Sequence, residues 1–120
     1  MKTILIIEDN NDIMENTVEL LQLQGYHVIS ANNGRLGITL AKDNNPDVIL
    51  CDIMMPEANG YEVLTALKSN ELTADIPFIF LTASVEKKEV EIALKMGAQG
   101  YINKPYEPKE LFETIVQFIR

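Results

Sequence analysis

The sequence contains one cysteine, one histidine and few basic residues. The single cysteine, Cys51, excludes an internal disulfide and is typical of a protein that works in a reducing cytosol. Together with His27 it cannot supply the ligands of a structural zinc site, and we interpret His27 as a residue on a strand edge. The formal net charge of −8 argues against direct binding to nucleic acid, which requires clustered lysine and arginine.

Long hydrophobic runs are also absent, and none approaches the ~20 residues of a membrane-spanning helix. The N-terminus has a short apolar run but no small-residue cleavage site, so it predicts a first strand rather than a signal peptide. A length of 120 residues predicts a single domain over residues 1–120. We therefore expect a cytoplasmic globular protein without a membrane segment.

Short apolar runs alternate with segments of helical periodicity along the chain. The runs are continuous, which is typical of strands buried on both faces of a parallel sheet. They are Ile4–Ile7, Val28–Ile29, Val48–Cys51, Ile76–Leu81 and Gly100–Ile102. The helical stripes are Met14, Val18 and Leu21; Leu36, Leu40 and Ala41; Tyr61, Leu64 and Leu67; Val90, Ala93 and Leu94; and Leu111, Ile115 and Phe118. The pattern predicts an α/β fold with a five-stranded parallel sheet covered by helices on both faces.

Polar side chains follow four of the predicted strands. Glu8 and Asp9 follow the first run, and Asp52 follows the third. Thr82 follows the fourth run, and Lys104 follows the fifth. Because ligands bind beyond the carboxyl ends of parallel strands, we expect three carboxylates, a hydroxyl and an amine to converge on one rim of the sheet.

These groups suit phosphoryl chemistry. Neighbouring carboxylates repel one another, and a hard divalent cation such as Mg²⁺ relieves that repulsion with Glu8 and Asp9 as ligands. Lys104 neutralises part of the remaining charge and can pair with an anion. Positioning and charge neutralisation supply most of the catalysis of phosphoryl transfer. A carboxylate can itself be the nucleophile, and Asp52, alone at the end of the central strand, is the candidate.

Each of these residues also has an ordinary explanation when it is taken alone. Asp9 or Asn10 can cap the following helix, and we expect Asn10 or Asn11 to do so in part. Lys104 alone would be a solvated surface lysine, and Thr82 alone would be a strand residue. Their joint placement at four strand ends favours a shared site.

The ordered set makes the chain resemble, along its whole length, the response-regulator receiver domains of bacterial two-component signalling. The matching features are Glu8-Asp9, the stretch Asp52-Ile53-Met54-Met55-Pro56 with Gly60 beyond it, Thr82-Ala83, Tyr101 and Lys104-Pro105. Each feature is weak alone, whereas the set at this spacing is highly specific. The resemblance implies a doubly wound, flavodoxin-like (CheY-like) sheet in the order 2-1-3-4-5 with five helices.

The resemblance also implies the chemistry at the strand ends. A histidine kinase or a histidine phosphotransfer protein would pass a phosphoryl group from phosphohistidine to Asp52. Glu8, Asp9 and Asp52 would hold Mg²⁺, together with the backbone carbonyl of Met54. The domain would act only on itself, by phosphotransfer and auto-dephosphorylation, so we do not expect an enzyme with a separate substrate.

The remaining site residues have implied roles in binding and switching. Thr82 and the backbone N–H of Ala83 would bind phosphoryl oxygens, Lys104 would pair with the phosphate, and the peptide bond to Pro105 would be cis. Movement of Thr82 would let Tyr101 rotate. The surface of the fourth helix, fifth strand and fifth helix would then change for an output protein, a fused effector domain or a second copy.

Two further features bear on partners and kinetics. The expected last helix carries a second apolar row of Phe112, Val116 and Ile119, which we interpret as a wide packed face, with a docking or dimerisation surface as the alternative. Met54 and Ser84 flank the site at positions that influence phosphate loss in the family. Neither is acidic or carries an amide, so neither predicts a phosphoryl lifetime.

Three alternative functions can each be distinguished from a receiver domain by a feature of the sequence. A flavodoxin-like cofactor binder needs phosphate-cradling amides after the first strand, where this chain has Glu8 and Asp9. An aspartyl phosphatase would place its nucleophile after the first strand in an Asp-x-Asp arrangement, which the sequence lacks. A degenerate receiver acting as a passive binding module would have lost part of the site, whereas the set here is intact. The cognate kinase and the output are not predicted.

Overall fold

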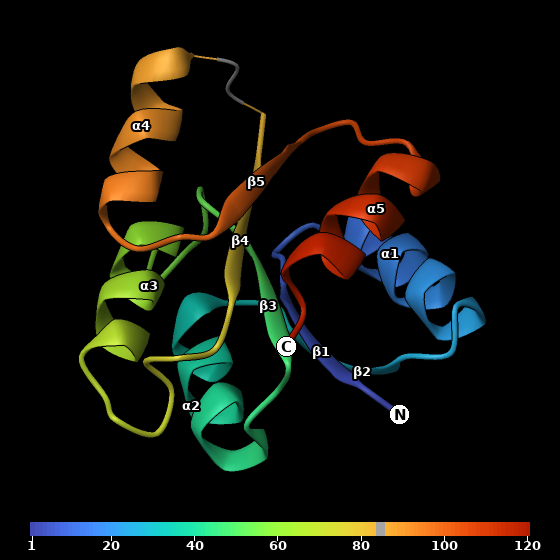
Figure 1. Cartoon of the computed structure of the whole chain (residues 1–120), viewed down its shortest axis with the longest axis horizontal. Helices are drawn as coiled ribbons and strands as arrows, with labels where there is room; N and C mark the ends of the chain where they lie inside the picture. Colours follow the sequence, from blue (N-terminus) through green and yellow to red (C-terminus); the bar gives the residue numbers. More distant parts are fainter. Residues whose placement is uncertain (84–85) are drawn as a thin grey trace.

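The computed structural model describes residues 1–83 and 86–120, which form a five-stranded parallel sheet and five helices (Figure 1). The strands are β1 (Thr3–Ile7), β2 (His27–Ala31), β3 (Val48–Asp52), β4 (Phe78–Thr82) and β5 (Gly100–Asn103). The helices are α1 (Asn11–Leu23), α2 (Gly34–Asn44), α3 (Gly60–Lys68), α4 (Lys87–Lys95) and α5 (Pro108–Phe118). The strand order β2-β1-β3-β4-β5 confirms the predicted doubly wound fold.

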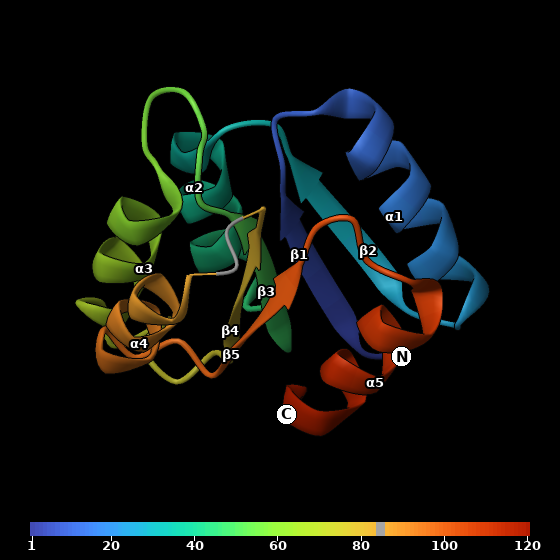
Figure 2. The same ribbon diagram turned by 90° about the horizontal axis from the view of Figure 1, so that it is seen from above.

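The helices cover the two faces of the sheet unequally. Helices α1 and α5 lie on one face, and α2, α3 and α4 lie on the other (Figure 2). Successive strand residues point to opposite faces, so Leu5 and Ile7 of β1 join the core under α2 and α3, while Ile4 and Ile6 join the core under α1 and α5. The sheet is therefore buried on both sides, as its continuous apolar strands predict.

The predicted cap of the first helix is confirmed. The Asn10 side chain accepts a hydrogen bond from the Ile13 amide at 3.0 Å and caps α1. Gly25 and Gly97 follow the ends of α1 and α4 with φ values of +90° and +106°, a backbone conformation that favours glycine. His27 is exposed on β2, which is an edge strand, as expected.

Two of the predicted helix stripes are partly wrong. Leu36 is 41% exposed, because α2 packs on the sheet at Gly37 and against Ala58 and Val63 at Gly34. A Cβ at Gly37 would lie 2.4 Å from the Ile7 side chain, so the helix approaches the sheet only because this position has none. The buried positions of α2 are the small residues Gly34, Gly37 and Ala41, and Ile38 and Leu40 pack against the same core while partly exposed.

Helix α4 differs in the same way. Ala93 is its buried residue, and Leu94, which is 46% exposed, is turned away from the contact. None of the helices in the described part of the chain has both the length and the apolar character that crossing a bilayer would require.

Candidate functional site

The parallel sheet brings the five predicted site residues to one edge. Glu8 and Asp9 follow β1, and Asp52 ends the adjacent β3. Thr82 ends β4, which pairs with β3, and Lys104 follows β5, which pairs with β4. Since all strands run in the same direction, their carboxyl ends meet at this edge.

The three acids form a compact cluster. One carboxylate oxygen from each of Glu8, Asp9 and Asp52 lies within 4.8 Å of the other two. Glu8 is fully buried and Asp52 is 8% exposed, whereas Asp9 lies open to solvent. Three converging carboxylate oxygens, one of them reached by water, are a donor set that fits a hard divalent cation such as Mg²⁺.

Lys104 provides a positive charge within this cluster. Its ammonium forms an ion pair with Glu8 and lies 3.3 Å from Asp52 Oδ2. Burial lowers the pKa of Lys104, but the contacts with Glu8 and Asp52 outweigh it and raise the pKa above its ordinary value. The Lys104 backbone N–H also donates to the Thr82 carbonyl at 2.8 Å, which ties the lysine to the end of β4.

The crowding of the acids raises the pKa of Glu8 in particular. Burial, together with the hydrogen bond and charge of Asp52, raises the pKa of Glu8 to about 7, although Lys104 opposes the shift. With a pKa of about 7, the Glu8 carboxyl group is about half protonated near neutral pH. A bound cation would replace that proton.

We expect the metal-free protein to lose stability as the pH rises from about 4.5 to about 7. The folded state binds the Glu8 proton more tightly than the unfolded state, for which the ordinary pKa is 4.5, so raising the pH through this window favours unfolding. The loss should be on the order of 3 kcal/mol. Urea unfolding with a chelator, at about pH 5 and about pH 8, measures it.

Glu8→Gln should flatten this dependence because it removes the titrating group. Glu15→Gln, at an exposed position of α1, is the matched control and should keep the wild-type slope. Equal slopes in the wild type and in Glu8→Gln would contradict the assignment.

An open pocket of about 550 Å³ lies over Asp52. It is lined by Asp52, Ile53, Met54, Tyr61, Thr82, Ala83, Glu89 and Lys104. Every residue predicted to contact the phosphoryl group lines this pocket, and Met54 is 79% exposed at its mouth. Ser84, the other predicted flanking residue, lies outside the described residues.

Sequence reasoning did not identify Tyr61 and Glu89 as site residues. Both come from helices, α3 and α4, and their place in the pocket depends on how these helices dock against the sheet. No local pattern encodes that docking. Helical stripes alone carried no signal for either residue.

The predicted switch pair borders a second, much smaller cavity. Thr82 and Tyr101 both line a void of about 10 Å³ beneath α4, with Phe80 and Ala93 in its wall. The Tyr101 side chain is too large for this void, and the residue is 41% exposed. The peptide bond between Lys104 and Pro105 is cis, as the resemblance implies.

The second apolar row of α5 is mostly packed. Phe112 and Ile119 contact the core under α1 and α5, whereas Val116 is 68% exposed. The interpretation as a wide packed face is therefore right for two residues and wrong for Val116. The helix turns Val116 to solvent, whereas Leu111 and Ile115 lie on its buried side.

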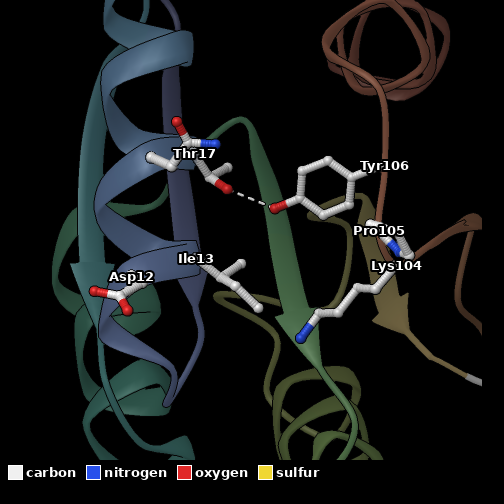
Figure 3. A pocket seen from close by; sticks show the side chains of 7 residues that line it. Asp12, Ile13, Thr17, Lys104, Pro105 and Tyr106 are labelled. Atoms are coloured by element: carbon white, nitrogen blue, oxygen red, sulfur yellow. Dashed lines mark hydrogen bonds between the residues drawn. The ribbon is translucent and has the colours of Figure 1, made fainter.

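A third pocket, of about 250 Å³, lies between α1 and the segment that joins β5 to α5 (Figure 3). Asp12, Ile13 and Asn16 of α1 form one wall, and Pro105 and Tyr106 belong to the other. A hydrogen bond between the hydroxyl groups of Thr17 and Tyr106 joins the two walls.

The fold and this arrangement of acids and lysine define a receiver domain. The chain matches the response regulator receiver domain family over residues 4–116, and it belongs to that family. It is thus a phosphoacceptor domain of two-component signalling. Among curated relatives, the response regulator SaeR of Staphylococcus aureus (strain USA300) is 39% identical over 111 residues, which are 92% of this chain and 47% of SaeR. The chain spans about half the length of the curated relatives it matches.

Solved structures agree with this assignment. The chemotaxis protein CheY4 of Vibrio cholerae has a TM-score of 0.94 and 28% identity, with 99% of each chain covered. The receiver domain of the sensor histidine kinase PA1611 of Pseudomonas aeruginosa PAO1 has a TM-score of 0.90 and 27% identity, covering 98% of this chain and 96% of that one. That domain was determined with a magnesium ion coordinated in its active site cleft.

Proposed function

We propose that Asp52 is the phosphoacceptor and that phosphorylation depends on Mg²⁺ held by Glu8, Asp9 and Asp52, with the Met54 carbonyl as a further ligand. The observation that carries this proposal is the meeting of three carboxylates and one ammonium beside an open pocket that Asp52 and Lys104 line. Bound Mg²⁺ would offset the negative charge of the acids and of the entering phosphoryl oxygens.

The transfer step uses the Asp52 carboxylate as nucleophile. One carboxylate oxygen attacks the phosphorus of a phosphohistidine on a histidine kinase or histidine phosphotransfer protein. The phosphorus–nitrogen bond breaks, the imidazole leaves with the electron pair and takes up a proton, and an aspartyl phosphate forms. Asp52 suits this role because β3 is buried along its length and holds the side chain rigidly at the pocket.

Three neighbours stabilise the product. Lys104, already 3.3 Å from Asp52 Oδ2, pairs with a phosphoryl oxygen after transfer. The hydroxyl of Thr82 and the backbone N–H of Ala83 bind the other oxygens, since both residues line the same pocket. The aspartyl phosphate is later lost by hydrolysis, so the domain acts on itself and has no separate substrate.

Phosphorylation then changes the surface of α4, β5 and α5. Thr82 moves toward the phosphoryl group and enlarges the void that it shares with Tyr101, so that the tyrosine ring can turn inward. This surface would contact an output protein, a fused effector domain or a second copy. These partners, and a cytoplasmic location, stay predictions.

An intact-mass measurement tests the proposal. Incubation of the wild-type protein with acetyl phosphate and Mg²⁺ should add the mass of one phosphoryl group, because the small donor replaces phosphohistidine and releases acetate. A chelator should prevent the gain in mass. Without a bound cation, nothing offsets the repulsion between the clustered carboxylates and the entering phosphoryl oxygens. A protein that gains no mass and gives no heat of Mg²⁺ binding in calorimetry would be a passive binding module instead.

A further inference from the structure

A hydrogen bond between two hydroxyl groups ties α1 to the segment that carries Lys104. Thr17 lies on α1 and is fully buried, and Tyr106 follows Lys104 by two residues (Figure 3). The two hydroxyls are 89 positions apart in the sequence. Because Thr17 is fully buried and Tyr106 is half-buried, loss of the Tyr106 hydroxyl would leave the Thr17 hydroxyl without this hydrogen bond in a buried position.

The Thr17 end of this hydrogen bond lies on the helix that begins beside the acids. Helix α1 begins at Asn11, two residues after Asp9, and the Asn10 backbone N–H donates to Glu8 Oε2 at 3.4 Å. Thr17 lies on the same helix, on the side that packs against the sheet. The position of Thr17 is therefore fixed relative to the acids.

The Tyr106 end of the hydrogen bond lies on the segment that carries the Lys104 ammonium. Lys104 is held at its backbone by the Thr82 carbonyl, and its side chain extends away from Tyr106 to Glu8 and Asp52 (Figure 3). Tyr106 also packs its ring against the core under α1 and α5. Ring packing has little directional preference, whereas a hydrogen bond fixes distance and angle, so the hydroxyl defines the spacing between α1 and this segment.

We propose that Tyr106, through its hydrogen bond to Thr17, is a positioning residue that holds the Lys104 ammonium between Glu8 and Asp52. The inference rests on the proposed function, in which Lys104 binds the phosphoryl group. Tyr106 does not touch the reacting atoms. It acts by fixing the position of the Lys104 backbone relative to α1.

Chemical labelling of lysine tests the positioning directly. Tyr106→Phe and Thr17→Val each remove one hydroxyl and keep the shape of the side chain. Either change should raise the rate at which acetic anhydride labels Lys104 several-fold relative to the exposed Lys109, measured by peptide mass spectrometry. Tyr26→Phe, which removes a hydroxyl from a tyrosine on the same face of the sheet, should leave the ratio unchanged.

Phosphorylation rates supply the second readout. Tyr106→Phe should slow phosphorylation by acetyl phosphate about fivefold in the wild-type background and less than about twofold in a Lys104→Met background, because the two residues act as one unit. A role in general packing would give the same factor in both. Unchanged labelling of Lys104, or equal factors in the two backgrounds, would overturn the proposal. Failure of the wild type to accept a phosphoryl group would instead reject the proposed function. The labelling experiment would still test whether Tyr106 positions Lys104, because it does not depend on phosphorylation.

Discussion

Asp52→Asn should not gain a phosphoryl group from acetyl phosphate at any Mg²⁺ concentration. The asparagine side chain has nearly the shape of aspartate, but its amide is a poor nucleophile and cannot form the acyl phosphate. The expected loss is complete, because Asp52 ends the central strand and is the one of the three clustered acids that lines the pocket. Intact-mass spectrometry of the treated protein measures it.

The same variant should stay folded. Removing a negative charge beside Glu8 relieves repulsion, so we expect the free energy of unfolding to change by no more than about 1 kcal/mol. Asp43→Asn, at an exposed position of α2, is the matched control and should be phosphorylated like the wild type. A mass gain in Asp52→Asn would place the acceptor on another residue.

Lys104→Met should slow phosphorylation by roughly 10²-fold to 10³-fold, the usual effect of removing one preorganised charge donor from a transition state. Methionine fills a similar volume but cannot pair with the phosphoryl oxygens. Near neutral pH the change should not unfold the protein, because Glu8, whose pKa is about 7, can then keep its proton. Initial rates with acetyl phosphate, followed by intact mass, give the factor.

Lys109→Met is the control for this change. Its ammonium lies 3.9 Å from Glu113 on an exposed turn of α5, and Lys109 does not line the pocket over Asp52, so its loss should leave the rate unchanged. A Lys104→Met protein that is phosphorylated within about threefold of the wild-type rate would remove the lysine from the mechanism.

Most of the fold was predictable because its signals are local. Continuous apolar runs marked the buried strands, and Asn10 marked the start of α1 as its capping residue. The site was predictable for a related reason: once the strands are parallel, Glu8, Asp52 and Lys104 must meet at one edge. Their convergence follows from topology alone.

The remaining features depend on packing that the sequence pattern does not record. Leu36 looked like a core residue, but small side chains let α2 approach the sheet on another face. Glu89 enters the phosphoryl pocket through the docking of α4. The bond between Thr17 and Tyr106 joins hydroxyls from opposite ends of the chain, and single threonines and tyrosines carry no sign of such a partner.

The burial of Cys51 has a consequence for how the protein meets oxidants. Its thiol is fully buried in the core under α2 and α3, donates to the Asp52 carbonyl at 3.2 Å, and has a pKa that burial raises well above its ordinary value. A protonated, enclosed sulfur reacts slowly with peroxide or alkylating reagents. Modification of Cys51 would therefore show that the centre of the sheet opens transiently, because the thiol is not accessible at the surface of the folded protein.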